Sequence, residues 1–302
     1  MNENISFKKW LIGKGRAQHT IRRYLTVEKE FISWYEKENQ CVFKPNVVTS
    51  YELQKWKNAL KDTEANNGKP FAPTTINNKI VCLKAYFQYL KDIELLQVNP
   101  AVDLATIKIQ NRFPTPRWLE EDEKRLLFLY LEKDERFNKK GYRYVRNIAI
   151  IFFMLYAGLR VGEVVSLQLC DVENGTIYIR DGKGGKSRII PMHNKLKKAY
   201  LEWLDYRDYL EVKHNYVFVS GKTLGPMTDV GIRHLFSKIE KQTRIKELSP
   251  HVLRHTFGHD LQKKGYGLTM IADLMGHSDV NTTRIYTAAS QNEMISAINH
   301  LD

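Results

Sequence analysis

Ten residues near the end of the first third of the chain, Lys108 to Arg117 (KIQNRFPTPR), interrupt an otherwise periodic sequence. The stretch holds two prolines and three basic residues without regular apolar spacing, so neither a helix nor a strand is expected to run through it. A chain of 302 residues is also long for a single core. We therefore predict two domains, residues 1–107 and 118–302, joined by a linker over residues 108–117. This linker is expected either to lie along a phosphate backbone or to be a solvated hinge.

The first domain is predicted to be helical. Between Thr20 and Tyr35 the apolar residues recur at three- and four-residue spacings, which is typical of an amphipathic helix. The same pattern predicts helices over Ser50 to Leu60 and from Pro73 to Leu90, with a shorter one before residue 20.

The second domain has mixed patterns. The most apolar run, Ile148 to Ala157 (IAIIFFMLYA), predicts a buried helix. Thr176 to Ile179 and Ser187 to Pro191 alternate in strand fashion around the turn DGKGGK, which predicts a β-hairpin. We also predict a short strand over Tyr216 to Val219. The remaining predicted elements are helices: Leu119 to Leu131, Leu196 to Tyr209, and further helices from Asp229 onward. The expected fold class is mainly α with a small β component.

The composition indicates which class of partner the protein binds. Lys and Arg number 47 against 34 Asp and Glu, and the net charge of +13 favours a polyanion such as nucleic acid. A membrane is disfavoured, because the longest apolar run is far shorter than the roughly 20 residues that span a bilayer. The start MNENISFKKW lacks the apolar stretch of a secretory signal, and three scattered cysteines form no disulfide or zinc pattern. A cytoplasmic protein is expected.

Gly158-Leu159-Arg160 follows the apolar helix, and Glu163 comes three residues later. An arginine beside a buried element needs an anionic partner. Glu163 would make this a structural ion pair, whereas a phosphate would use the bidentate geometry of the guanidinium. On this fragment alone the structural pair is favoured.

Lys183 lies in the glycine-rich hairpin turn, where the backbone can approach a ligand closely and a lysine can reach a phosphate. The alternative is that Lys183, Lys186 and Arg188 are an ordinary solvated basic turn. The turn lacks the spacing of a P-loop.

Ser249 and Pro250 predict the start of a helix that carries His251, Arg254 and His255 on one face, a combination suited to an anion. His251, His255 and His259 also have the spacing of metal ligands. We discount a metal site, because no glutamate follows His255 as in HExxH and Arg254 would repel a cation. His259 is expected to be packed.

His277 follows a glycine, and Tyr286 lies in TTRIYT near the C-terminal end of the sequence. Taken separately, such a histidine is usually a helix cap and such a tyrosine usually packs in the core.

The conjunction of these residues is more specific than its parts. The strings GLRVGE, GKGGKSR, HVLRHTFG and LMGHSDVNTTRIYT resemble the catalytic signature of the tyrosine recombinases, also called the lambda-integrase family. His277 follows Arg254 by 23 residues and Tyr286 follows His277 by 9, which suits that family. The segment INNKIVCLKAYFQYLKDIELLQVNPA resembles the end of its helical core-binding domain. The likeness covers nearly the whole chain and is closest to the Xer-like or mobile-element branch.

The resemblance implies a site-specific DNA recombinase whose core-binding and catalytic domains form a clamp round DNA. Tyr286 would attack the scissile phosphorus and give a 3′-phosphotyrosyl intermediate, with His251 as the base. The implied catalytic residues are Arg160, Lys183, His251, Arg254, His277 and Tyr286.

The other implied roles are electrostatic. Arg160, Arg254 and His277 would bind the nonbridging oxygens, and Lys183 would protonate the leaving 5′-oxygen. Glu163 would orient its neighbours. No metal, ATP or other cofactor is implied, because two arginines and a lysine supply the positive charge.

The implied partner is double-stranded DNA with a specific recombination site, bound by a homotetramer on two DNA sites; accessory DNA-binding proteins are left open. An apolar stripe after Tyr286 would pack either in its own subunit or against a neighbouring one: Met294, Ile295, Ile298 and Leu301. The alternatives are a type IB topoisomerase, which shares the chemistry, and a non-catalytic DNA-binding regulator on the same scaffold.

Overall fold

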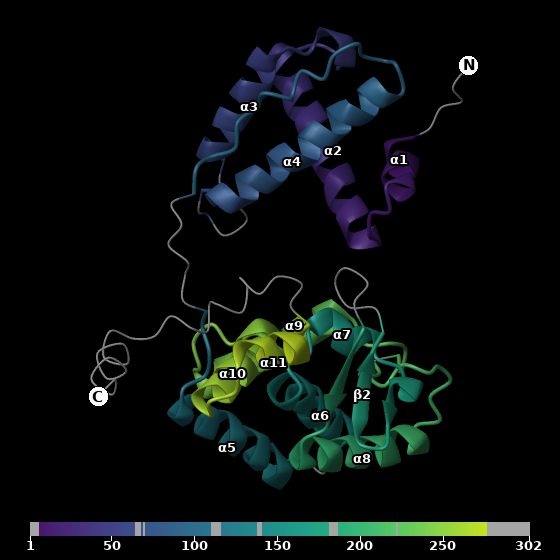
Figure 1. Ribbon diagram of the computed structural model, residues 1–302, viewed down its shortest axis with the longest axis vertical. Coiled ribbons are helices and arrows are strands. Elements are labelled where there is room, and N and C mark those ends of the chain that lie inside the picture. Colours follow the sequence, from purple (N-terminus) through teal and green to yellow (C-terminus); the bar gives the residue numbers. More distant parts are fainter. Residues whose placement is uncertain are drawn as a thin grey trace. The chain divides into compact units, whose positions relative to one another are not determined.

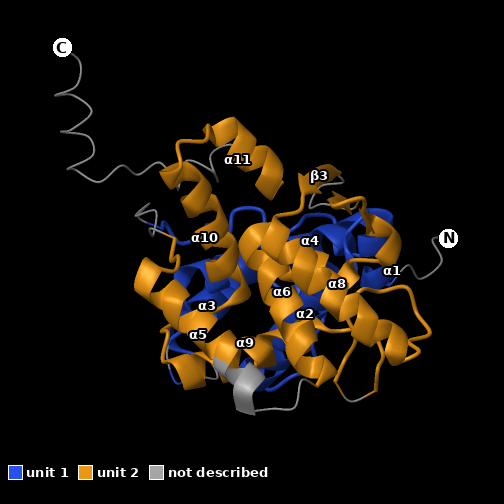
Figure 2. Ribbon diagram, turned by 90° about the horizontal axis from the view of Figure 1, so that it is seen from below, with its two compact units in different colours: residues 1–112 blue, residues 113–302 orange. Residues whose placement is uncertain are grey.

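The computed structural model describes residues 6–63, 68, 70–109, 116–137, 141–180, 187–221 and 223–276. Its contacts divide the chain into two compact units, residues 1–112 and 113–302 (Figures 1 and 2). Each unit has its own apolar core. Helices predominate in both units, and among the described residues the one sheet belongs to the second unit. The predicted class, mainly α with a small β component, is confirmed, while the clamp round DNA stays a prediction.

The first unit is a small helical bundle (Figure 1). In it α2 and α4 pack against each other, and α1 and α3 contact both. Thr49 and Glu52 form a capping box at the start of α3, and Pro73 occupies the first turn of α4, where its missing N–H costs nothing. Its helices are α1 (Phe7–Gly13), α2 (Gln18–Asn39), the 3₁₀ turn η1 (Pro45–Val47), α3 (Ser50–Asp62) and α4 (Pro73–Asp92).

The second unit is built round α6, which packs against α8 and α10. Ala149, Ile150 and Phe153 of α6 are fully buried, so the predicted buried helix over the apolar run is confirmed. The elements of this unit are α5 (Glu121–Phe137), α6 (Tyr142–Tyr156), α7 (Val161–Ser166), η2 (Leu169–Asp171), β1 (Val172–Glu173), β2 (Thr176–Ile179), β3 (Arg188–Pro191), α8 (Asn194–Tyr209), α9 (Asp229–Thr243), α10 (Pro250–Lys263) and α11 (Leu268–Met275).

The sheet is antiparallel with strand order β1-β2-β3. Strands β2 and β3 form the predicted hairpin, and its turn over residues 181–186 lies outside the described residues. Ile177 pairs with Ile190 and Ile179 pairs with Arg188. Because directly opposed residues share one face of a sheet, Arg188 lies on the same inner face as these buried isoleucines.

The predicted strand over Tyr216 to Val219 is wrong. The segment makes only isolated bridges, from Tyr216 to Gln168 and from Val219 to Pro226. Its middle is buried as the apolar pattern indicated, but the N–H of Val217 bonds to a loop carbonyl and its C=O accepts from the indole of Trp203. Within the described residues no continuous strand pairs with this segment, so it is buried without being a strand.

None of the helices in the described parts of the chain has the length and apolar character needed to cross a membrane.

Candidate active site

Arg160 stands at the N-cap of α7, directly after the loop that ends α6. Its Nη1 lies 2.7 Å from Oε1 of Glu163, and its backbone N–H donates to Oε2 of the same carboxylate at 2.8 Å. Its Nη2 donates to the carbonyl of Gly276 at 2.7 Å. The side chain is still 23% exposed, so the guanidinium is held on two sides and remains open to solvent on another.

Arg254 approaches the same carboxylate from α10. Ser249 caps this helix and Pro250 occupies its first turn, which confirms the predicted helix start. The Arg254 side chain is buried and donates to the carbonyls of Gly158 and Met275. Its Nη1 lies 3.9 Å from Oε2 of Glu163. The fold thus brings together two arginines that are far apart in the sequence.

Arg188 is a third guanidinium in this cluster. From the first position of β3 it holds Glu163 bidentately, with Nη1 2.9 Å from Oε1 and Nη2 2.7 Å from Oε2. Its side chain is only 7% exposed. The interpretation of Arg188 as part of a solvated turn is therefore wrong. Strand alternation could have indicated its burial, because Arg188 shares a sheet face with Ile190.

Glu163 is the common partner of these arginines. Burial alone would raise the pKa of its carboxyl group, but the hydrogen bonds and charge of Arg188 outweigh burial, with further help from the Arg160 backbone N–H and the charge of Arg254. The pKa of Glu163 falls to about 2, so the carboxylate stays ionised at neutral pH.

The charges of the cluster do not cancel. Three guanidinium groups surround one carboxylate, which leaves two positive charges in excess. Arg160 brings part of that excess to the surface. Guanidinium groups fixed in this way suit a tetrahedral oxyanion, because they are already in place and need little reorganisation to receive it.

Two histidines lie on α10 beside the cluster. His251 lies at the start of α10. It is exposed, but neighbouring residues shield part of its ring from water. This desolvation lowers the pKa of His251, and the positive charges of Arg254, Arg233 and Arg160 lower it further, against the opposing charge of Asp229.

His255 follows one turn later. Burial, then the neighbouring His251 and Arg254, lower the pKa of His255 to about 4. Both rings are therefore neutral at pH 7, and a neutral imidazole can accept a proton.

Lys183, His277 and Tyr286 lie outside the described residues. Of their direct chain neighbours, Gly276 is described. Gly276, which directly precedes His277, has φ +61° at the C-cap of α11 and accepts a hydrogen bond from Arg160. The residue before His277 is therefore tied to the arginine cluster.

His259 does not join the other histidines. Its ring stacks on that of Trp118, with centroids 4.3 Å apart and planes 9° apart, as expected for a packed side chain. Next to it, the backbone N–H of Leu119 donates to Oγ1 of Thr256 at 2.8 Å. The first residues after the linker are thus fixed on α10. Within the described residues no group of three or more histidine, cysteine or acidic side chains is arranged to hold a metal ion.

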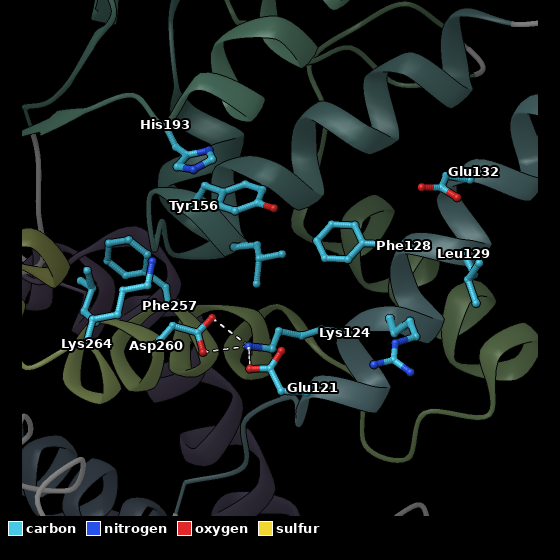
Figure 3. Close-up of a pocket in the computed structure, with 13 residues that line it drawn as sticks. Glu121, Lys124, Phe128, Leu129, Glu132, Tyr156, His193, Phe257, Asp260 and Lys264 are labelled. Atoms are coloured by element: carbon cyan, nitrogen blue, oxygen red, sulfur yellow. Dashed lines mark hydrogen bonds and ion pairs between the residues drawn. The ribbon is translucent and has the colours of Figure 1, made fainter.

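A separate pocket of about 580 Å³ opens between α5, the end of α6 and α10 (Figure 3). At its edge Lys124 Nζ lies 2.8 Å from Glu121 Oε1 and 3.0 Å from Asp260 Oδ1. Arg160, Arg188 and Arg254, which form the anion site round Glu163, are not among its lining residues. This pocket is therefore distinct from the anion site. Its apolar lining consists of Phe128, Leu129, Leu155, Tyr156, Phe257 and Leu261.

Comparison with known proteins agrees with these features. The phage integrase family matches residues 117–293. The chain is 31% identical over 268 residues to tyrosine recombinase XerD of Rickettsia prowazekii (strain Madrid E), covering 84% of this chain and 82% of that protein. It is 30% identical over 293 residues to tyrosine recombinase XerC of Thermodesulfovibrio yellowstonii, covering 93% of this chain and 89% of the relative.

Among solved structures, the Tn1549 transposon integrase in complex with circular intermediate DNA has the same fold, with a TM-score of 0.69 at 22% identity over 97% of both chains. The family match alone spans more than half of the sequence. The relatives are similar along most of their length, including the part that corresponds to the first unit. The chain belongs to the phage integrase family of tyrosine recombinases.

Proposed function

We propose that this recombinase cuts and rejoins DNA strands with Tyr286 as its nucleophile, at a phosphate held by Arg160 and Arg254. The observation that carries the proposal is the anion site itself. Two arginines that match the family's motif converge there, are fixed by Glu163, and leave an excess of positive charge. Lys183 and His277 complete the proposed set by their positions in the matching motifs.

The first step is an attack by Oη of Tyr286 on the scissile phosphorus. A bond forms between Oη and phosphorus, and the bond from phosphorus to the 5′-oxygen breaks. The products are a 3′-phosphotyrosine and a free 5′-hydroxyl. Because the covalent link keeps the energy of the phosphodiester, attack by another 5′-hydroxyl rejoins the strand without ATP.

Protons move at both ends of this reaction. Tyrosine has an ordinary pKa near 10, so the attacking hydroxyl must lose its proton as the bond forms. His251 is the proposed acceptor, which the lowered pKa of its ring supports. Lys183 is the proposed donor to the departing 5′-oxygen.

Charge accumulates on the nonbridging oxygens as the phosphorus becomes five-coordinate. Arg160 and Arg254 would hold these oxygens, with His277 as a further donor. Preorganised donors of this kind typically lower the barrier by roughly 3–4 kcal/mol each.

The experiment that tests this function traps the covalent intermediate. Labelled duplex DNA from beside the gene, nicked close to candidate sites, lets the cleaved end diffuse away, so that the enzyme cannot rejoin the strand. We expect an adduct that resists SDS and disappears with protease, with the protein on the 3′-phosphate side of the break. Tight specific binding without any adduct would instead favour a non-catalytic regulator.

Recombination is favoured over simple DNA relaxation because the similar proteins are named recombinases. The substrate would be double-stranded DNA with a specific site, and the first unit would be the core-binding domain. With a net charge of +13, binding should weaken steeply as salt concentration rises. We also propose that the protein acts in the cytoplasm.

Four subunits on two DNA sites would carry out the exchange, and we propose that the apolar stripe after Tyr286 reaches a neighbouring subunit. The stripe lies outside the described residues. Its proposed acceptor is the pocket beside α5 and α10, whose lining holds six apolar side chains and where Lys124 pairs with Glu121 and Asp260 (Figure 3). Aliphatic side chains would be buried there against the apolar lining.

Two leucines of α5 test this assembly. Leu129 lines the pocket and is 41% exposed, whereas Leu126 on the same helix is 47% exposed and is not a lining residue. We expect Leu129→Glu, like deletion of residues 289–302, to reduce recombination at least tenfold while binding of one subunit to a half-site is kept. Leu126→Glu should spare both properties. Recombination assays and gel-shift titrations measure these effects, and equal behaviour of the two glutamate variants would exclude this acceptor.

A further inference from the structure

Arg188 connects three elements that carry proposed catalytic residues. It belongs to β3, just after the hairpin turn that holds Lys183. Its Nη atoms bind both oxygens of Glu163 at the start of α7. Its Nε donates to the carbonyl of Leu274 at 2.9 Å, near the end of α11.

We propose that Arg188 is a positioning residue, which balances Glu163 so that Arg160 and Arg254 keep their charge for the phosphate, and which fixes the end of α11 before His277. The proposal rests on the function proposed above and deepens it. It assigns to Arg188 an effect on the rate of cleavage without contact to DNA.

Arg188 differs from Arg254 in its partners rather than in its burial. Both side chains are buried, at 7% and 4% exposed, but the Nη atoms of Arg254 donate to uncharged carbonyls, whereas those of Arg188 hold a carboxylate. The three nitrogens of Arg188 all donate to protein oxygens, two to the carboxylate and one to Leu274. Arg188 therefore acts through the groups that it holds.

The electrostatic effect of Arg188 follows from the number of charges in the cluster. Without Arg188, two arginines would face one buried carboxylate, and the excess would fall from two positive charges to one. Glu163 would then compete with the phosphate for Arg160, whose Nη1 already lies 2.7 Å from it. Because the carboxylate is largely shielded from water, this competition is strong.

The geometric part concerns Gly276. A Cβ atom at this position would lie 2.7 Å from Nη1 of Arg188, so the guanidinium and the backbone are in close contact. With φ +61° the position also requires a left-handed conformation, which glycine adopts without strain. Gly276 is thus held between Arg188 on one side and Arg160, which binds its carbonyl, on the other.

The test compares single-turnover cleavage of the nicked substrate by Arg188→Gln with its affinity for a half-site. We expect cleavage to slow by about 10- to 100-fold, the loss that small misplacements of a reacting group cause, and affinity to change less than threefold. Arg180→Gln is the matched control, because Arg180 belongs to the same hairpin, is 65% exposed and pairs with Asp171 instead. It removes the same charge and should cleave at nearly the normal rate.

A double variant separates positioning from mere structural support. Adding Glu163→Gln to Arg188→Gln removes the carboxylate that would compete with the phosphate for Arg160, so cleavage should recover at least tenfold relative to Arg188→Gln alone. Loss of cleavage that runs parallel to loss of thermal stability, without recovery in the double variant, would overturn the proposal. So would normal cleavage by Arg188→Gln. Absence of an adduct with the unaltered protein would instead contradict the proposed function, which keeps the two failures distinct.

Discussion

Replacing Tyr286 with phenylalanine is expected to abolish the covalent protein–DNA adduct while leaving DNA binding intact. Phenylalanine keeps the ring but lacks the oxygen that would form the bond to phosphorus. Loss of a nucleophile can cost on the order of a million-fold in rate, which is below detection in an adduct assay. Incubation with nicked DNA, separation in SDS and autoradiography measure the adduct, and a gel shift measures binding.

A second tyrosine provides the control for this variant. Tyr266 lies between α10 and α11 and is 47% exposed. Tyr266→Phe removes a hydroxyl of the same kind from the same unit, and it should form the adduct at the normal rate. An adduct that persists in Tyr286→Phe would mean that another residue attacks the phosphate.

Gly158→Ala is expected to lower both stability and cleavage, although it adds only one methyl group. Gly158 has φ +61°, which costs other residues about 1–2 kcal/mol, and a Cβ atom there would collide with the ring of Phe257. With overpacking of about 1–3 kcal/mol, the total loss should be roughly 3 kcal/mol. The midpoint temperature of thermal unfolding should fall by about 2–4 °C for each kcal/mol of stability that is lost.

Cleavage should fall as well, because the carbonyl of Gly158 accepts a hydrogen bond from Arg254. Gly162→Ala is the matched control. This glycine lies in α7, only two residues after Arg160, and a Cβ atom there would meet nothing within 4 Å. Alanine in a helix should even add up to about 1 kcal/mol of stability. Equal stability of the two alanine variants would mean that the contact of the added methyl group with Phe257 does not destabilise the protein.

Local patterns predicted those elements whose neighbours are close in the sequence. The apolar run at Ile148 to Ala157 became the central helix of the second unit, and the Ser249-Pro250 pair starts α10. The hairpin formed where two alternating segments flank a glycine-rich turn. Each of these features depends on spacing and capping, which a single sequence displays directly.

The geometry of the anion site could not be predicted from such patterns. The fragment with Arg160 and Glu163 favoured a structural ion pair, and this pair does form. Its carboxylate, however, is held by arginines from three different elements. Long-range packing decides that arrangement. The failed strand at Tyr216 to Val219 has the same cause, because burial was evident from the sequence but the absence of a strand partner was not.

The anchoring of Trp118 and Leu119 gives α10 a mechanical role. Near the point where the chain enters the second unit, Arg117 bonds to Glu123 and to the carbonyl of Lys246, and Trp118 and Leu119 then contact the ring of His259 and the hydroxyl of Thr256. Thr256 lies only two residues beyond Arg254, about 3 Å along the helix axis. Part of any force on the chain at its entry to the second unit would therefore reach α10 within a single turn of the arginine proposed to hold the phosphate.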